Sequence, residues 1–291
     1  MTVEAFAKIN LTLEVLGARP DGYHELRSVV APVSLCDTLS VEESDSLSSD
    51  TGYDDDLCLK AARVLRDECG VRRGADIRVT KRIPAGGGLG GGSADAAAVL
   101  RALNGLWRLG LSDDDLIAVA ARVGSDVPAL VAGGVVLMEG RGERVTRLFG
   151  SGESPRMDVV LAFPGVHSST AQVYAGCTPR GERGGNATAA MAEALRAGDM
   201  DAVSASLAND LQESAFRLHP EIGAAADALR SVGASGILMS GSGSTVFALA
   251  RSPEYARRAA ESVDRLGIPS LHVACGMVEF AENGIIRTCR I

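Results

Sequence analysis

A dense run of glycines is the feature of this sequence that points most directly to chemistry. Between Gly86 and Gly92 there are six glycines in seven positions, interrupted only by Leu89. Glycine adopts positive φ at little cost, so successive N–H groups can turn toward one anion. An alanine-rich segment with helical spacing, 91–107, follows directly, and a helix N-terminus favours negative charge. The run therefore predicts a phosphate-binding loop, in which Ser93 opens the helix and offers a hydroxyl group to a phosphate or its metal ion.

Other interpretations of this run are weaker. Gly86, Gly88 and Gly91 match the dinucleotide pattern G-x-G-x-x-G, but so many glycines make that match almost automatic. The preceding segment, 75–83, alternates and exposes Arg78, whereas the first strand of a dinucleotide-binding fold is usually apolar throughout. No Gly-Lys-Ser/Thr follows, so the run is not a Walker A loop. A nicotinamide-dependent dehydrogenase is therefore a distant alternative. If the run has no binding role, it is a flexible surface loop or a helix start that packs closely against a sheet.

Composition limits the class of protein. The chain has 291 residues, 46% hydrophobic and 23% charged, with a formal net charge of −8. An acidic balance argues against nucleic acid or an anionic membrane as partner. Six cysteines and four histidines are scattered without metal-ligand spacing or a disulfide pattern,. The N-terminus lacks the pattern of a signal peptide, and no apolar run reaches 18 residues, so we expect a cytoplasmic protein.

Hydrophobic spacing predicts an α+β protein with mainly antiparallel strands, since strands and helices do not follow a strict strand–helix–strand rhythm. A Gly-, Ser- and Pro-containing stretch near Gly150 predicts a boundary between domains 1–150 and 151–291. The expected strands are 6–13, 26–35, 37–43, 75–83, 133–140, 157–163, two short ones around 241–244, 270–276 and a hairpin around 282–284. The expected helices are 55–69, 91–107, 112–124 with Ser112 as N-cap, several between 187 and 232, and 252–267. The polar stretch 44–56 is expected to be a loop, and 6–13 to be buried on one face only.

Three segments together resemble the motifs of the GHMP kinases. "PAGGGLGGGSADAAA" is similar to the second motif of that family, "AFAKINLTLEVLG" to the first and "LMSGSGSTVFAL" to the third, and they follow in the family's order. The resemblance implies an N-terminal ribosomal-protein-S5-like domain with a left-handed β-α-β element, and a C-terminal ferredoxin-like domain. It also implies ATP and Mg²⁺ in a cleft between the domains. The cofactor-binding residues would be Pro84, Ala85, Gly86, Gly87, Gly88, Leu89, Gly90, Gly91, Gly92, Ser93 and Ala94, with Ser93 the possible metal contact.

In the family's pattern Lys8 and Asp126 are the catalytic pair. A carboxylate within hydrogen-bond reach can orient an alcohol and take its proton. A neighbouring ammonium group keeps that carboxylate ionised and stabilises developing negative charge. The alternatives are a solvated strand lysine at position 8 and, at position 126, the N-cap of a helix that begins at Val127-Pro128.

Other segments resemble one branch of the family more closely. "AKINLTLEVLGARPDGYHEL", "GSDVPALVAGG" and "PGVHSSTAQVY" are similar to enzymes that phosphorylate the 2-hydroxyl group of a cytidylyl polyol in non-mevalonate isoprenoid synthesis. The resemblance assigns Tyr23 and His24 to the cytosine ring, with Tyr174 as the opposing ring, although tyrosines more commonly serve packing. Asn10 and Thr170 are weaker candidates for hydrogen bonds to the polyol.

Two positions depart from the branch, which often has Asn where Asp56 stands and Phe where Tyr174 stands. Two other functions stay open: another small-molecule GHMP kinase of the homoserine or mevalonate type, and a catalytically silent ligand-binding relative. The expected partners are the small-molecule substrate and ATP, with neither nucleic acid nor membrane, and the sequence does not choose between a monomer and a homodimer.

Overall fold

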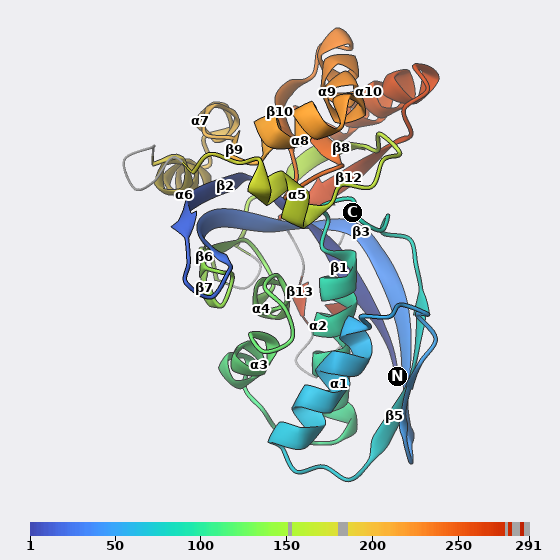
Figure 1. Cartoon of the computed structure of the whole chain (residues 1–291). Helices are drawn as coiled ribbons and strands as arrows, with labels where there is room; N and C mark the ends of the chain where they lie inside the picture. Colours follow the sequence, from blue (N-terminus) through green and yellow to red (C-terminus); the bar gives the residue numbers. More distant parts are fainter. Residues whose placement is uncertain (151–152, 180–185, 277–278, 281–285, 288–291) are drawn as a thin grey trace.

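The computed structural model of the chain describes residues 1–150, 153–179, 186–276, 279–280 and 286–287. In its N-terminal half, α2 packs on β1 and β3, with α1 and α4 beside it (Figure 1). The strands are β1 Thr2–Asn10, β2 Thr12–Ala18, β3 His24–Ser44, β4 Leu47–Ser49, β5 Gly74–Thr80, β6 Val136–Gly140 and β7 Arg144–Arg147. The helices are α1 Leu57–Glu68, α2 Gly91–Leu106, α3 Asp113–Ala120 and α4 Val127–Ala132.

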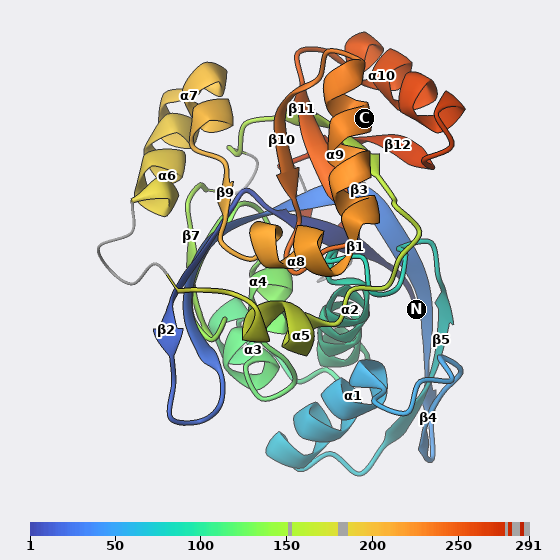
Figure 2. The ribbon, with the colours of Figure 1, turned by 45° about the horizontal axis from the view of Figure 1, so that its top comes forward.

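The C-terminal half contains an antiparallel sheet in the order β10-β11-β8-β12. Helices α9 and α10 pack on this sheet, while α6 and α7 lie together to one side (Figure 2). The chain order, strand–helices–strand–strand–helix–strand, with this strand order is the ferredoxin-like arrangement that the resemblance implied. The elements are β8 Met157–Ala162, α5 Thr170–Ala175, α6 Ala187–Ala197, α7 Met200–Ala205, β9 Ala208–Asn209, α8 Gln212–Leu218, α9 Pro220–Ser231, β10 Ser235–Met239, β11 Val246–Ala250, α10 Pro253–Arg265 and β12 Ser270–Cys275.

Strand β3 joins the two halves. It pairs antiparallel with β1, β2, β5 and β6, and at Val33 it also pairs with Cys275 of β12. The expectation of two strands, 26–35 and 37–43, is therefore wrong, because no glycine or proline separates Leu35 from Asp37 and the chain continues as one strand. The expected domain boundary near Gly150 falls between β7 and β8 and stays a prediction.

The expectation that 6–13 is one strand buried on a single face is also wrong. The segment divides at Leu11 into β1 and β2, and its polar face is as buried as its apolar one: Lys8, Asn10 and Thr12 are 4%, 1% and 0% exposed. Alternation along one strand identifies the two faces, but it does not show that residues from the C-terminal half cover the polar face.

Several short elements escape the sequence patterns, whereas the longer ones are confirmed. Strand β4 lies inside the expected loop 44–56 and pairs parallel with β5, and the two-residue strand β9 pairs parallel with β2. The helix expected over 112–124 is α3, which ends at Ala120, and Ser112 does form its capping box. Strands β13 Glu279–Phe280 and β14 Ile286–Arg287 pair antiparallel, while the turn expected at 282–284 lies outside the described residues.

Two negative findings concern the described part of the chain. None of its helices combines the length and the apolar composition that a membrane span requires. Among the described cysteines, Cys36, Cys58 and Cys69 are free thiols.

A buried carboxylate connects β2 to helix α6. Glu14 is 7% exposed and accepts hydrogen bonds from the backbone N–H groups of Ala187 and Thr188, at 3.2 and 3.3 Å. These groups belong to the first turn of α6, and the N-cap residue Asn186 makes no side-chain cap. Glu14, from another part of the chain, thus replaces the missing N-cap. Its negative charge also interacts favourably with the positive end of the helix dipole.

We expect Glu14→Ala to lower the free energy of unfolding by about 1–3 kcal/mol, because two buried N–H groups lose their acceptor. Glu14→Gln keeps an acceptor oxygen and should lose less. Urea unfolding measures both, with Glu193→Ala as the control because Glu193 is exposed on the same helix. An equal loss in Glu14→Ala and the control would contradict the capping role.

Candidate active site

A cleft of about 1310 Å³ lies where the two halves meet. Its walls come from β1, the glycine run, the start of α1, the segment before α4, the turn after β6, α5 and the turn 241–243. The structure brings nearly all of the predicted site residues to this cleft: Lys8, Asn10, Tyr23, His24, Pro84–Ser93, Asp126, Thr170 and Tyr174. Ala94 is the exception, since it is 2% exposed and faces the core instead.

The glycine run forms a tight loop that leads into α2. Gly86, Gly88 and Gly90 have φ of +67°, +73° and +68°, values that side chains disfavour,. Helix α2 begins at Gly91, where the expected range 91–107 begins, and Gly90 serves as N-cap, so Ser93 lies in the first turn and does not open the helix. Gly90 supplies no side-chain cap, so the first-turn N–H groups can bind an anion.

The turn that connects β10 and β11 docks on this loop. Thr245 N–H donates to the carbonyl oxygen of Gly87 at 3.1 Å, and the Ser240 hydroxyl donates to that of Gly88 at 2.9 Å. A Cβ at Gly88 would lie 2.1 Å from the carbonyl oxygen of Ser240. Asn209 supports the turn by donating to Met239 and Gly241 carbonyls, both at 2.8 Å. The loop is therefore a packed element and not a flexible surface loop.

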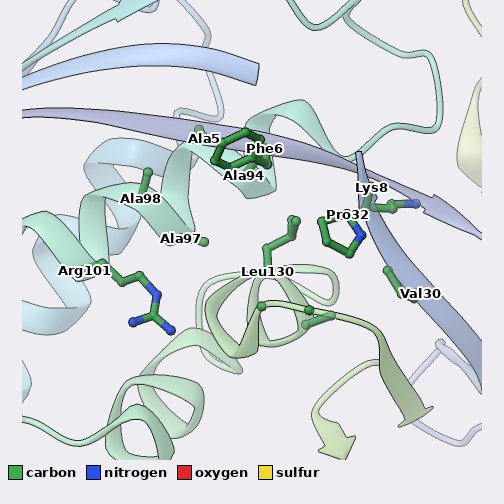
Figure 3. A pocket seen from close by; sticks show the side chains of 13 residues that line it. Ala5, Phe6, Lys8, Val30, Pro32, Ala94, Ala97, Ala98, Arg101 and Leu130 are labelled. Carbon is green, nitrogen blue, oxygen red and sulfur yellow. The ribbon is translucent and has the colours of Figure 1, made fainter. Parts of the chain in front are cut away.

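Lys8 projects from β1 beside the glycine loop. Its ammonium group donates to Asn10 Oδ1 at 2.7 Å and to the Gly88 carbonyl oxygen at 2.9 Å. Its alkyl stem borders a small cavity of about 30 Å³ between β1, α2 and α4, and the amino group points away from the α2 alanines that line that cavity (Figure 3). A 4% exposed lysine with these partners is not a solvated strand lysine.

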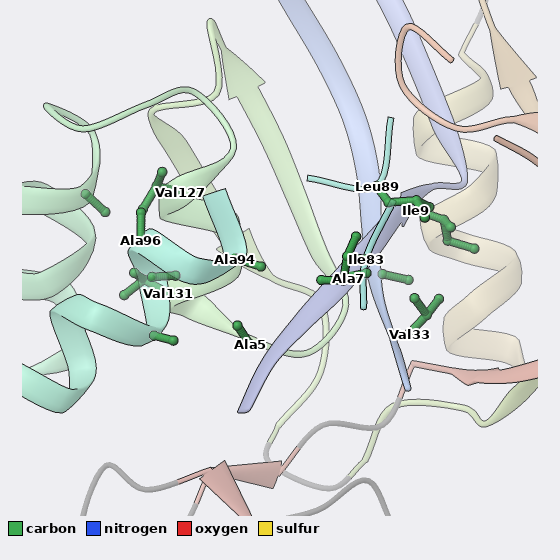
Figure 4. Close-up of a cluster of buried hydrophobic side chains, with 14 of the residues drawn as sticks. Ala5, Ala7, Ile9, Val33, Ile83, Leu89, Ala94, Ala96, Val127 and Val131 are labelled. Atoms are coloured by element: carbon green, nitrogen blue, oxygen red, sulfur yellow. The ribbon is translucent and has the colours of Figure 1, made fainter. Parts of the chain in front are cut away.

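The position of Lys8 is fixed by its neighbours along β1. Ala7 and Ile9 lie on the opposite face of the strand and pack in the main hydrophobic cluster together with Leu89 of the glycine run (Figure 4). The backbone N–H of Lys8 also donates to the carbonyl oxygen of Leu89 at 3.0 Å. Burial of Leu89 thus ties the glycine loop to the strand that carries the lysine.

Asp126 stands opposite the lysine. It occupies the N-cap position of α4, but its side chain makes no capping hydrogen bond. Its Oδ2 lies 3.5 Å from Lys8 Nζ, and the side chain is 34% exposed toward the cleft. Asp126 therefore stands at the N-cap position without capping the helix, and its carboxylate is available to a ligand beside the ammonium group.

Aromatic rings occupy the end of the cleft beyond Asp126. The rings of His24 and Tyr174 are in direct contact, with centroids 4.7 Å apart and planes inclined by 30°. Burial raises the pKa of the Tyr174 hydroxyl group. Tyr23 is 50% exposed, and the Arg141 guanidinium lies 5.2 Å from its ring centroid. A base expected between His24 and Tyr174 would require these rings to separate from this arrangement.

Thr170 and Asp56 are engaged in local contacts. The Thr170 hydroxyl lies 2.9 Å from the Ser242 hydroxyl, which joins α5 to the turn 241–243. Asp56 is the N-cap of α1 and accepts from the N–H groups of Cys58 and Leu59 at 2.8 and 3.1 Å. Its carboxylate has the acceptor role of a cap and offers no donor to a base.

A buried cluster of opposite charges lies below the glycine loop. The Lys81 ammonium group contacts the carboxylates of Asp37 and Asp95, the latter at 2.7 Å. Asp37 also accepts the N–H groups of Arg82 and Ile83, whereas Asp95 Oδ1 has no hydrogen-bond partner among the described residues. Burial raises the pKa of Asp95 to about 7, against the lowering effect of Lys81 and with a further rise from Asp37.

Sequence reasoning overlooked four residues of the site: Lys81, Asp95, Ser240 and Arg141. Lys81 lies five positions before the first glycine of the run and Asp95 three positions after the last, a spacing that could have been noticed. Arg141 stands between two glycines after a strand, which is typical of a turn and carries no chemical signal by itself. Ser240 precedes a glycine-rich turn, where only the three-dimensional contact shows its role.

The comparisons with known proteins agree with this geometry. Residues 56–134 match the GHMP kinases N terminal domain, and residues 191–268 match the GHMP kinases C terminal domain. The chain belongs to the GHMP kinase family and is an ATP-dependent small-molecule kinase.

Its similar relatives within that family are 4-diphosphocytidyl-2-C-methyl-D-erythritol kinases. The enzyme of Symbiobacterium thermophilum is 43% identical over 277 residues, which cover 90% of this chain and 95% of that one. The enzyme of Pelotomaculum thermopropionicum is 42% identical over 272 residues, with 89% and 92% covered. A crystal structure of 4-(cytidine 5'-diphospho)-2C-methyl-D-erythritol kinase has 39% identity and a TM-score of 0.80, with 95% and 99% covered. A homoserine kinase from Cytophaga hutchinsonii, 19% identical with a TM-score of 0.73, shares the fold over 95% of this chain and 96% of its own.

The raised pKa of Asp95 predicts an unusual pH dependence of stability. The carboxyl group loses its proton near pH 3.8 in the unfolded chain and near pH 7 in the folded one, so its contribution is full below about pH 4 and falls as pH rises to about 7. We expect the unfolding free energy of the natural chain, relative to Asp95→Asn, to fall over this range by up to about 4 kcal/mol. Urea unfolding at pH 4.5 and 7.5 measures this difference.

Asp114→Asn is the matched control, because Asp114 is exposed on α3. Its difference from the natural chain should change little over the same range. A difference for Asp95→Asn that is independent of pH would show that the folded protein does not hold a proton at this position.

Proposed function

We propose that the chain transfers the terminal phosphoryl group of ATP to the 2-hydroxyl group of 4-diphosphocytidyl-2-C-methyl-D-erythritol, a step of non-mevalonate isoprenoid precursor synthesis. The observation that carries the proposal is the Lys8–Asp126 pair, 3.5 Å apart, beside a glycine loop in one cleft. The relatives at 43% and 42% identity are named as kinases of this same substrate, which supports the proposal.

The proposed chemistry follows from the positions of these groups. The first-turn N–H groups of α2 and the loop glycines hold the triphosphate, where a helix N-terminus favours anions. Asp126 accepts the proton of the substrate hydroxyl group while the oxygen of that hydroxyl bonds to the terminal phosphorus of ATP. The bond from this phosphorus to the bridging oxygen breaks, and that oxygen leaves with ADP. Lys8 stabilises the negative charge that develops on the alcohol oxygen and the transferred group.

Mg²⁺ would arrive with the nucleotide. Among the described residues no three His, Cys, Asp or Glu side chains gather as a metal site, which fits a cation that is held mainly by phosphates and water. The Ser93 hydroxyl, in the first turn of α2 and on the wall of the cleft, is the side-chain oxygen that would contact the cation. The bound cation would neutralise phosphate charge during transfer.

The aromatic end of the cleft favours the cytidylyl substrate over smaller alcohols. Tyr23, His24 and Tyr174 give a base a stacking surface, and Asn10 and Thr170 are polar groups near the polyol. Homoserine and mevalonate have no ring for this surface. A catalytically silent relative is less favoured because both Lys8 and Asp126 are present and in contact.

A substrate panel tests the proposal directly. ADP release by the purified protein is measured with 4-diphosphocytidyl-2-C-methyl-D-erythritol, homoserine or mevalonate. We expect turnover with the first alone. Turnover with another alcohol, or nucleotide binding without turnover on any of them, would overturn the proposal in favour of the corresponding alternative.

Asp126→Asn should reduce kcat by about 10²- to 10⁴-fold, because an amide cannot take the proton of the hydroxyl group. The affinity for ATP, measured by calorimetry, should stay within about threefold, since the glycine loop is unchanged. Asp114→Asn provides the control for the loss of an acidic group. Nearly normal turnover in Asp126→Asn would exclude this carboxylate as the base.

Gly88→Ala should weaken ATP binding by at least about tenfold, a loss of about 1.4 kcal/mol. The new Cβ would stand 2.1 Å from the Ser240 carbonyl oxygen at a φ of +73°, so the loop must move,. Gly105→Ala, in the helix that follows the loop, is the control, because its Cβ would meet only a side-chain carbon at 3.6 Å. An unchanged affinity in Gly88→Ala would separate the loop from nucleotide binding.

A further inference from the structure

The cationic side chains that line the cleft differ in whether a carboxylate of the protein pairs with them. Three described lysine or arginine side chains reach it: Lys8, Lys81 and Arg141. Lys8 faces Asp126, and Lys81 faces Asp37 and Asp95. Two of the three cations thus have carboxylate partners inside the protein.

Arg141 is different. Its side chain makes one long hydrogen bond, from Nη2 to the Ala121 carbonyl oxygen at 3.4 Å, and its guanidinium lies 5.2 Å from the Tyr23 ring centroid. None of the ion pairs between described residues includes it. Asp21 feels its charge only weakly: the pKa of Asp21 is lowered first by the Tyr23 N–H and by Arg19, with which Asp21 is paired. Most of the guanidinium donors are therefore available.

The turn that carries Arg141 is rigid and adjoins the proposed base. The Arg141 N–H donates to Glu143 Oε2 at 2.7 Å, which closes the turn. Gly142 has a φ of +122°, and a Cβ there would lie 2.2 Å from the Ser125 carbonyl oxygen. The turn therefore rests directly on the segment that leads into Asp126. Arg141 extends from this turn into the cleft, with its guanidinium over the Tyr23 ring.

A guanidinium in this place suits a diphosphate. Stacking on Tyr23 orients the planar group through a cation–π contact and leaves its edge free for two phosphate oxygens. A nucleotide whose base stacks on the aromatic end and whose alcohol reaches Asp126 must place its diphosphate between them. We propose that Arg141 binds the diphosphate of the alcohol substrate and so selects a nucleoside diphosphate ester over an uncharged or singly charged alcohol.

This inference rests on the proposed function, and kinetics can separate the two. Arg141→Met should raise the KM for the cytidylyl substrate by about 10- to 100-fold, the effect of losing charge-assisted hydrogen bonds. The KM for ATP and kcat should stay within about threefold, because Arg141 touches neither the glycine loop nor the reacting groups. Arg141→Lys keeps the charge but not the fork, and should lie between the two.

Arg144→Met is the matched control, because Arg144 is 60% exposed on β7 and pairs with Glu25 outside the cleft. Its kinetics should equal those of the natural chain. If the natural chain does not turn over the cytidylyl substrate, the proposed function itself fails. If it does and Arg141→Met leaves KM unchanged, only the role of Arg141 is overturned.

Binding without catalysis gives an independent readout. Calorimetry with cytidine and with cytidine diphosphate should show that the diphosphate strengthens binding to the natural chain, and that Arg141→Met removes most of this gain. An equal loss of affinity for both ligands would overturn the proposal, because Arg141 would then only support the Tyr23 surface.

Discussion

The burial of the Lys8 ammonium group is the constraint on which the site depends. A buried cation is costly unless hydrogen bonds and opposite charge compensate for lost water. The compensating groups come from three parts of the chain: Asn10 of the same strand, the Gly88 carbonyl of the glycine loop and Asp126 before α4. Since one ammonium group must satisfy all three, it holds the phosphate loop and the carboxylate at fixed positions relative to β1.

The glycine loop is held from the opposite side by the C-terminal half. Ser240 and Thr245 bond to the carbonyls of Gly88 and Gly87, so both halves of the chain define the shape of one loop. The close approach of Ser240 to Gly88 explains why bare backbone is needed there beyond any need for positive φ. The loop carbonyls point to protein donors, which leaves the N–H groups at the start of α2 for an anion.

How much the sequence could predict depends on how local each signal is. The helix after the glycine run and the Ser112 cap follow from patterns within short segments, whereas the ferredoxin-like order was implied by the resemblance of motifs. The structure contains all three. The two-sided burial of β1 could not be predicted, because the covering residues lie far along the chain: Ser240, which accepts the Asn10 N–H, is 230 positions away. Short strands such as β4 and β9 have too few residues to show a period.

The same distinction applies to the site. Lys8 and Asp126 were identified through a resemblance of motifs, while the sequence alone left a solvated lysine and a helix cap as alternatives. Those alternatives differ in the contacts that the two side chains make, and such contacts are visible only in the folded structure. Asp126, for example, occupies the N-cap position of α4, but its side chain makes no capping hydrogen bond. Arg141 could not be identified from the sequence, because what distinguishes it is that none of the ion pairs between described residues includes it. Lys8 and Lys81 are neutralised by carboxylates that arrive from distant elements, and the remaining cation becomes evident only when those pairs are known. Whether a cation in the cleft is paired thus depends on the contacts of the whole fold and not on its local sequence. A cation without a carboxylate partner in the protein can then select a substrate that carries the opposite charge.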